Sequence, residues 1–232
     1  MLVRVEEDRF VLVTQSDHAH LASELLALWR DPELLEHPRR QSLLQAIRLH
    51  DNGWREVDSA PRVDPDSGAP LSFDEIDEEL RMEIWRRGIL RYGEEDPYTA
   101  LLVLTHAREL HPERPGMVEL VAELEESKET WLEEVGLRPA EIEDDYHWLA
   151  VADLLSLVAV NRWSGTRDVH GECEARSRDG ELLLDPFFLA GATRFSVPCR
   201  RIPRRDYEGD SDLTLELATA RWKKDILRVC PA

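Results

Sequence analysis

The chain has 232 residues, of which 42% are hydrophobic and 33% charged, the balance of a folded globular protein. Its formal net charge is −19, because 48 acidic residues outnumber 29 lysines and arginines. Most of the molecule would therefore repel the phosphate backbone of a nucleic acid and the surface of an anionic membrane. We expect neither as a partner. A phosphorylated small molecule remains compatible with this charge, because a bound cation and local arginines can invert the field within one cleft.

Cysteine usage and the N-terminal sequence indicate the compartment. The three cysteines are odd in number and widely spaced, without a C-x-x-C pair, which argues against a disulfide framework and against a thiolate zinc site. The N-terminus does not resemble a signal peptide, and no apolar run approaches the length that spans a bilayer. We expect a cytoplasmic protein with reduced thiols.

The first three quarters of the chain predict a short hairpin followed by helices. Residues 2–5 and 10–13 are β-prone and flank a polar turn, which predicts a β-hairpin within 1–15. Residues 55–71 contain three prolines and a glycine and predict a loop. Apolar residues at helical spacing, with capping signals, predict helices over 17–30, 38–51, 72–92, a segment opened by Asp96–Pro97, 115–135 and 139–163.

From residue 171 onward the pattern changes to short β-prone pieces separated by turns. These pieces cover 181–184, 194–197, 213–217 and 226–229. The sequence thus predicts a mainly α protein, a helical bundle with a small β-sheet formed by the N-terminal hairpin and the C-terminal segment. Its expected parts are a β-hairpin over 1–15, a helical domain over 16–165 and a small β-rich segment over 170–232, which packs on the helical domain.

Several histidines and aspartates occupy positions that helical phase assigns to the core. His18 shares its face with Leu21 and Leu25, whereas His20 points elsewhere, so only His18 is an inward candidate. His50 and Asp51 lie at the edge of the buried face of the second helix. A His-Asp dipeptide is weak evidence by itself, and its position gives it weight.

Asp153 is the strongest anomaly in the sequence, because it interrupts the apolar run 149–160. An unpaired buried carboxylate costs several kcal/mol, so a metal, an arginine or a protonated histidine should match it. His106 also belongs to an apolar stripe, although a histidine in such a place is more often a core imidazole bonded to a carbonyl.

Together, His18, His50, Asp51 and Asp153 offer two imidazoles and two carboxylates. This donor set suits a divalent transition metal, that is Mn, Fe, Zn, Co or Ni, better than a purely oxygen-seeking ion. We favour a metal site over the alternative, a purely structural buried network.

The order His, His-Asp, Asp resembles the HD-domain (His-Asp) superfamily of metal-dependent phosphohydrolases over residues 16–163. Further motifs resemble more closely an uncharacterised bacterial family known only as a domain of unknown function. These motifs are Gln15 to Ala19, His50 to Trp54, Asp58 with Pro61, Asp96 to Leu102, and Asp153 to Leu157 with Asn161. The superfamily resemblance implies an HD-domain-like helical bundle in which His18, His50, Asp51 and Asp153 bind one divalent metal.

Binuclear members of this superfamily add two histidines between the His-Asp pair and the last aspartate. The histidines in that interval are His106, His111 and His147. His111 falls at the end of its helix before Pro112, and His147 points away from Asp153 by helical phase, so only His106 is well placed. We therefore expect one metal.

The resemblance implies hydrolysis of a small phosphate ester or nucleotide. In this interpretation Asp51 acts at the metal, and His106 contacts the substrate or the leaving group. Asp58 belongs to loop 55–71, which we interpret as a lid over the site; the alternative interpretation is a solvated acidic loop. Two other functions stay open, a diiron oxygenase of the same superfamily and a non-catalytic metal-binding or regulatory module. The sequence predicts no oligomeric state.

Overall fold

The structure, a computed structural model, describes residues 1–232. Its strands are Leu2–Val5 (β1), Arg9–Val13 (β2), Arg167–Val169 (β3), Cys173–Arg178 (β4), Glu181–Asp185 (β5), Thr193–Pro203 (β6) and Trp222–Pro231 (β7). Its helices are Gln15–Ala27 (α1), Pro32–Leu35 (α2), Arg40–Leu49 (α3), Arg55–Ser59 (α4), Glu78–Leu90 (α5), Pro97–Leu110 (α6), Pro115–Glu123 (α7), Glu125–Val135 (α8), Pro139–Asn161 (α9) and Asp210–Thr219 (α10), with a 3₁₀ turn at Asn52–Trp54 (η1). None of the helices combines the length and the apolarity that crossing a membrane requires.

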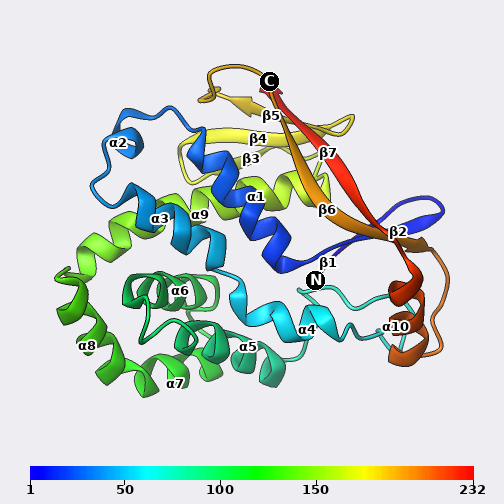
Figure 1. The fold of residues 1–232 in the computed structure, drawn as a ribbon, viewed down its shortest axis with the longest axis horizontal. Coiled ribbons are helices and arrows are strands. Elements are labelled where there is room, and N and C mark those ends of the chain that lie inside the picture. Colours follow the sequence, from blue (N-terminus) through cyan, green and yellow to red (C-terminus); the bar gives the residue numbers. More distant parts are fainter.

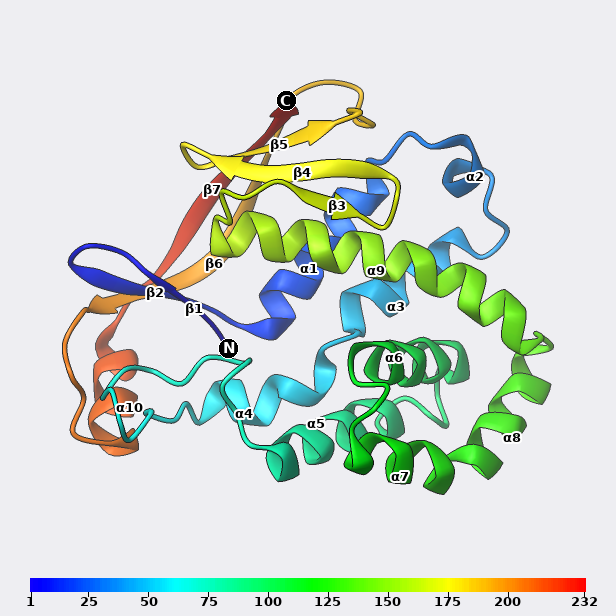
Figure 2. The same ribbon diagram turned by 180° about the vertical axis from the view of Figure 1, so that it is seen from behind.

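All seven strands form one mixed sheet in the order β1-β2-β6-β7-β5-β4-β3. Every neighbouring pair is antiparallel except β5 and β7, which run parallel. The sheet curls around α1 and α9, and α5 to α8 lie on the far side of these two helices (Figure 1). From behind, α9 runs along β3 and β4 (Figure 2).

The predicted fold, a helical bundle with a small sheet, is therefore wrong. The N-terminal hairpin does join the C-terminal strands, since Phe10 pairs with Ile202, but the result is a single curled sheet of seven strands. Helical periodicity shows that a helix has an apolar face, and it does not show whether a helix or a sheet covers that face. The size of the sheet therefore could not be predicted from helical periodicity.

Three segments differ from the prediction. Residues 213–217, expected as a strand, lie in α10, where Leu213 and Leu217 are one helical turn apart and both pack in a small core with Phe10 and Ile202. Conversely, β3 and β4 were not predicted. In β4 the buried residues are Cys173, Ala175 and Ser177, and their small side chains alternate with charged ones, so the strand carries little hydrophobic signal.

Several helix boundaries also differ from the predicted ones. Predicted helix 115–135 is two helices that meet at Leu124, and predicted loop 55–71 begins with α4. The helix predicted over 72–92 is α5, which starts only after Asp77, whose carboxylate accepts the Leu80 N–H at 2.8 Å. The predicted capping contact between Ser72 and Glu75 does form, since Glu75 accepts the Ser72 N–H at 2.8 Å. The capping box therefore closes a turn that precedes α5.

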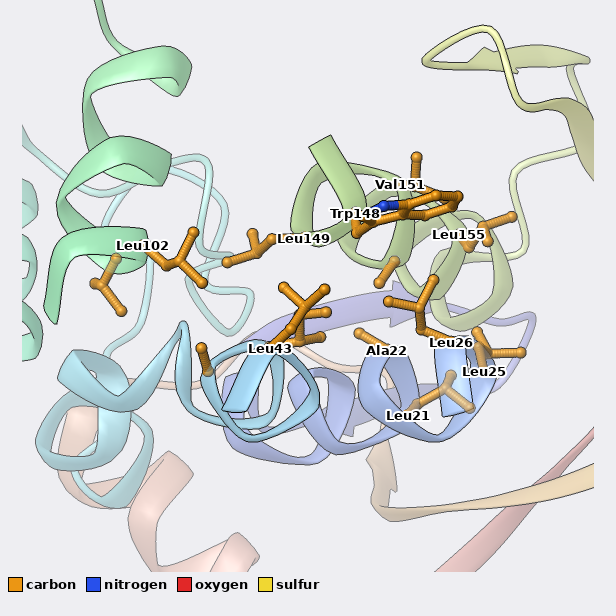
Figure 3. Packing of buried hydrophobic residues seen from close by; sticks show 14 of the residues in the cluster. Leu21, Ala22, Leu25, Leu26, Leu43, Leu102, Trp148, Leu149, Val151 and Leu155 are labelled. Atoms are coloured by element: carbon orange, nitrogen blue, oxygen red, sulfur yellow. The ribbon is translucent and has the colours of Figure 1, made fainter. Parts of the chain in front are cut away.

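The main core lies where α1, α3, α6 and α9 meet (Figure 3). Leu25 and Leu26 of α1 and Leu149 and Leu155 of α9 belong to this core, and all four are buried. Burying one such side chain contributes about 1.5–3 kcal/mol. The packing fixes these helices against one another, and it thereby fixes the polar side chains that they carry.

Candidate metal centre

Five buried polar residues from four parts of the chain meet beside this core. His18 lies in the first turns of α1, His50 directly follows α3, Asp51 precedes η1, His106 lies in α6 and Asp153 lies in the middle of α9. Each is at least 92% buried. The structure thus brings together all four predicted metal ligands, together with His106.

The ring of His50 has a fixed proton arrangement. Its Nδ1 lies 2.7 Å from the Ile47 carbonyl oxygen, which can only accept, so Nδ1 carries the hydrogen. In the neutral ring, Nε2 then presents a lone pair. That atom is buried without a hydrogen-bond partner, and it lies 3.4 Å from Asp51 Oδ2 and 3.4 Å from Asp153 Oδ1.

His18 is oriented in the same way by Ser156. The Ser156 hydroxyl donates to the Asp153 carbonyl oxygen at 2.8 Å, so its oxygen accepts from His18 Nδ1 at 2.6 Å. The lone pair of a neutral His18 therefore also sits on Nε2. It points to Asp51 Oδ2 at 2.8 Å and to Asp153 Oδ1 at 3.6 Å.

Two imidazole lone pairs and two carboxylates face one another in this arrangement, and a cation is required to hold them together. Without a metal, a proton supplies the charge. Burial opposes charging of His50, but Asp51 and Asp153 outweigh it and raise its pKa well above the ordinary range. Burial likewise opposes ionisation of Asp51 and Asp153, and the adjacent histidines nevertheless lower the pKa of each carboxyl.

The histidine–carboxylate distances also fit those between neighbouring ligands of a metal ion. Ligand atoms about 2.1 Å from a common ion lie about 3.0 Å apart in an octahedron and about 3.4 Å apart in a tetrahedron. The contacts between the two Nε2 atoms and the two carboxylates span 2.8 to 3.6 Å. Each imidazole also donates its other N–H to an oxygen, as metal-binding histidines do. The residues present therefore fit a divalent transition metal.

His106 extends the cluster. Its ring packs edge-on against His50, with centroids 5.0 Å apart, and its Nδ1 lies 3.4 Å from the Tyr146 hydroxyl. Burial lowers the pKa of His106 to about 4, so the ring is neutral at pH 7. His106, His50 and Asp153 form a second group of three ligand atoms within 4.8 Å of one another, beside the group His18, His50 and Asp51.

The cluster opens into a cavity of about 290 Å³, a small one for a ligand site. Its polar lining residues are Gln15, His18, Asp51, Asp74, Arg81, His106, His111, Arg114 and Asp153, and its apolar ones are Trp54, Phe73, Trp85, Leu110 and Leu157. Sequence reasoning missed Gln15, Arg81 and Arg114. The one available signal was the i, i+4 spacing of Arg81 and Trp85, which puts an arginine on the buried face of α5.

Asp58 is not brought to this cavity. It lies in α4, where its carboxylate pairs with the Met1 ammonium at 2.7 Å and accepts the Gln15 N–H at 2.6 Å. Loop 55–71, the predicted lid, contributes no lining residue. Asp58 therefore anchors the start of α1, the helix that carries His18.

The remaining histidines divide between the cavity and the surface. His111 follows the last residue of α6 and lines the cavity, although its place at the helix end before Pro112 argued against it. His147 lies away from the cluster and bonds to Glu172 at 2.9 Å.

Fold and site together define a protein with a buried His-Asp centre between a curled sheet and a helical layer. The chain belongs to the family described as "Protein of unknown function (DUF3891)", whose sequence model matches residues 1–204. The match runs from β1 to β6 and includes every residue of the cluster. No curated protein and no solved structure matches the chain.

Proposed function

We propose that this protein is a metal-dependent hydrolase of a small phosphate ester or nucleotide, with His18, His50, Asp51 and Asp153 as metal ligands. The observation that carries the proposal is the pair of oriented imidazoles, each with Nε2 toward the same two carboxylates at the side of a cavity. The order of these four residues along the chain, which resembles the HD-domain phosphohydrolases, supports the choice of phosphate chemistry.

A bound divalent metal supplies a Lewis acid for a phosphoryl oxygen and lowers the pKa of a water molecule. The protein's own groups orient and protect the reaction. Ser156 and the Ile47 carbonyl hold the two imidazoles, and the surrounding core excludes bulk water from their inner side. Gln15 Oε1 is buried without a partner in the cavity wall, so it can accept a hydrogen bond from a water molecule or a substrate hydroxyl.

His106 is the candidate proton carrier. Because burial lowers its pKa to about 4, it is an unprotonated base at pH 7. It lines the cavity and lies beside the cluster, so it can accept a proton from a group bound there or hold that group by a hydrogen bond.

A diiron oxygenase is the second candidate, and one observation favours it. His50, His106 and Asp153 form a second ligand group that shares two residues with the proposed site. A second ion bound there would complete a binuclear centre. Metal analysis of protein purified without added metal separates the two functions, because two irons per chain favour the oxygenase and one metal favours the hydrolase.

Turnover tests the proposal directly. A panel of phosphate monoesters, diesters and nucleotides is incubated with protein loaded with Mn, Co, Ni or Zn. We expect hydrolysis of at least one member, and a loss of at least about a thousandfold in His50→Ala and Asp51→Ala, since each removes a metal ligand. His20→Ala is the matched control, because His20 neighbours His18 in sequence and does not line the cavity. Activity that survives both ligand changes would refute the assignment.

A further inference from the structure

The cavity has a second charged end, where Arg81, Arg114 and His111 line it together with Asp74. Arg114 is compensated, because it pairs with Glu78. Arg81 is different. It is 8% exposed, its Nη2 donates to the carbonyl oxygens of Asp74 at 3.3 Å and Ile76 at 3.1 Å, and its Nε is buried without a partner.

No carboxylate contacts this guanidinium directly, although Glu78, Asp74 and Asp77 act on its charge from farther away. Its hydrogen-bond partners are backbone carbonyls, and it takes part in no ion pair. A buried charge without a counter-ion is destabilising, and the cost falls when an anion binds beside it. Arginine is also the side chain best suited to carboxylate and phosphate groups, because its planar fork matches both.

The two ends of the cavity are electrostatically distinct. After burial, the charges that act on the pKa of His106 are those of Asp153, His50, Asp51 and His18. After burial, the pKa of His111 is lowered by Arg81 and Arg114 and raised by Glu78. Trp85 lies between the two histidines, with its ring centroid 5.7 Å from that of His106 and 6.3 Å from that of His111.

We propose that Arg81 binds a second anionic group of the substrate, so that the substrate is a small molecule with a metal-binding phosphoryl group at one end and a carboxylate or phosphate at the other. The middle of such a molecule lies against Trp85 and the other apolar walls. The inference rests on the proposed function for the metal-binding phosphoryl group. For the second anionic group it rests on Arg81 alone.

The test uses probes that cannot be hydrolysed. Alkylphosphonates bind through one anionic group, and ω-phosphonocarboxylates of the same chain length add a carboxylate. Alkane bisphosphonates of that length add a phosphonate and show which second anion is preferred. Affinities for the metal-loaded full-length protein are measured by isothermal titration calorimetry over chains of two to four methylenes.

We expect at least one doubly anionic probe to bind about tenfold or more tightly than its matched alkylphosphonate, the gain typical of charge-assisted hydrogen bonds. Arg81→Gln should reduce this ratio to within about twofold and leave the alkylphosphonate affinity unchanged, and Arg81→Lys should retain part of the ratio. Arg86→Gln is the control, because Arg86 lies on the same helix, pairs with Glu123 and does not line the cavity.

A wild-type protein that shows no preference at any chain length overturns the inference, even if Arg81→Gln fails to fold. The inference is also overturned if folded Arg81→Gln still prefers the doubly anionic probe over the alkylphosphonate. Turnover does not enter the measurement. If no phosphoester is hydrolysed while the ratio depends on Arg81, the hydrolase proposal fails and the second anion site stands.

Discussion

Helix α9 carries two deeply buried aspartates whose surroundings differ completely. Asp145 is fully buried and is held by Arg39 Nε at 2.7 Å, His37 Nε2 at 2.9 Å and the Tyr98 hydroxyl at 2.6 Å. Asp153, two turns later, faces histidine nitrogens and a second carboxylate. The first aspartate is neutralised by an arginine, and the second depends on a proton held by His50 when no metal is bound.

This difference separates a structural network from a functional one. A buried charge whose partners are all present gives rigidity, and here it ties the α2–α3 connection to α6 and α9. A cluster whose counter-charge is an exchangeable proton leaves a place that a metal ion can take. Burial alone does not distinguish the two networks. The chemistry of the side chains around each aspartate does.

The largest expected effect concerns stability. Asp145→Asn should lower the free energy of unfolding by about 3–5 kcal/mol, because it leaves Arg39 and its neighbours without their buried counter-charge. Asp153→Asn in metal-free protein should change it by less than about 1 kcal/mol, because one carboxylate, Asp51, still faces the histidines. Urea denaturation measures both, with exposed Asp144→Asn as the control. Equal costs at the two sites would remove the distinction.

Metal binding should stabilise the fold. At a hundred times the dissociation constant, a divalent transition metal should add about 2.7 kcal/mol to the free energy of unfolding, since it binds only the folded cluster. A chelator should reverse the gain, and His50→Ala should abolish it while His20→Ala retains it. Thermal denaturation with and without metal measures this, and an identical midpoint in both conditions would argue against the centre.

A smaller effect is expected from the residue that orients His18. Ser156→Ala removes the oxygen that accepts the His18 Nδ1 hydrogen, and loss of such an outer contact lowers metal affinity by about 10- to 100-fold. Ser23→Ala is the control, because Ser23 bonds to the Leu44 carbonyl, outside the cluster. Competition with a fluorescent chelator gives the affinities. Equal affinities in the two variants would show that Ser156 does not orient the ligand.

The smallest effect is a dependence on pH. In metal-free protein the raised pKa keeps His50 protonated at neutral pH, and a metal must displace that proton. Affinity should therefore rise by about tenfold per pH unit for each proton released, until pH passes the pKa. Calorimetry in buffers of different ionisation enthalpy counts the protons. Metal binding without proton release would mean that the histidines are already neutral.

The inward direction of His18 and Asp153 could be predicted because each one breaks a local pattern. His18 and Asp153 stand on apolar helix faces, and the phase of each helix shows that their side chains point inward. Asp145 gave no such signal, since it follows Glu143 and Asp144 in an acidic run. Its inward direction is explained by Arg39, which is far away in sequence.

The cavity and the sheet could not be predicted for the same reason. Arg81 belongs to a polar helix segment, and only the packing of α5 beside α6 places it in the cavity wall with His111. The strand order likewise depends on pairings between distant segments, such as β2 with β6. Local patterns report the type of an element, and they do not report its neighbours.

The position of β7 at the middle of the sheet has a consequence for how the chain folds. The hairpin β1–β2 is synthesised first, yet its free edge has no partner until β6 emerges, and β7 then joins this half to β5, β4 and β3. Pairing of such distant segments is slow because a long loop must close first. The helices that carry the buried histidines and aspartates leave the ribosome before the sheet can close. Until then their apolar faces are exposed, and exposed apolar surface favours aggregation.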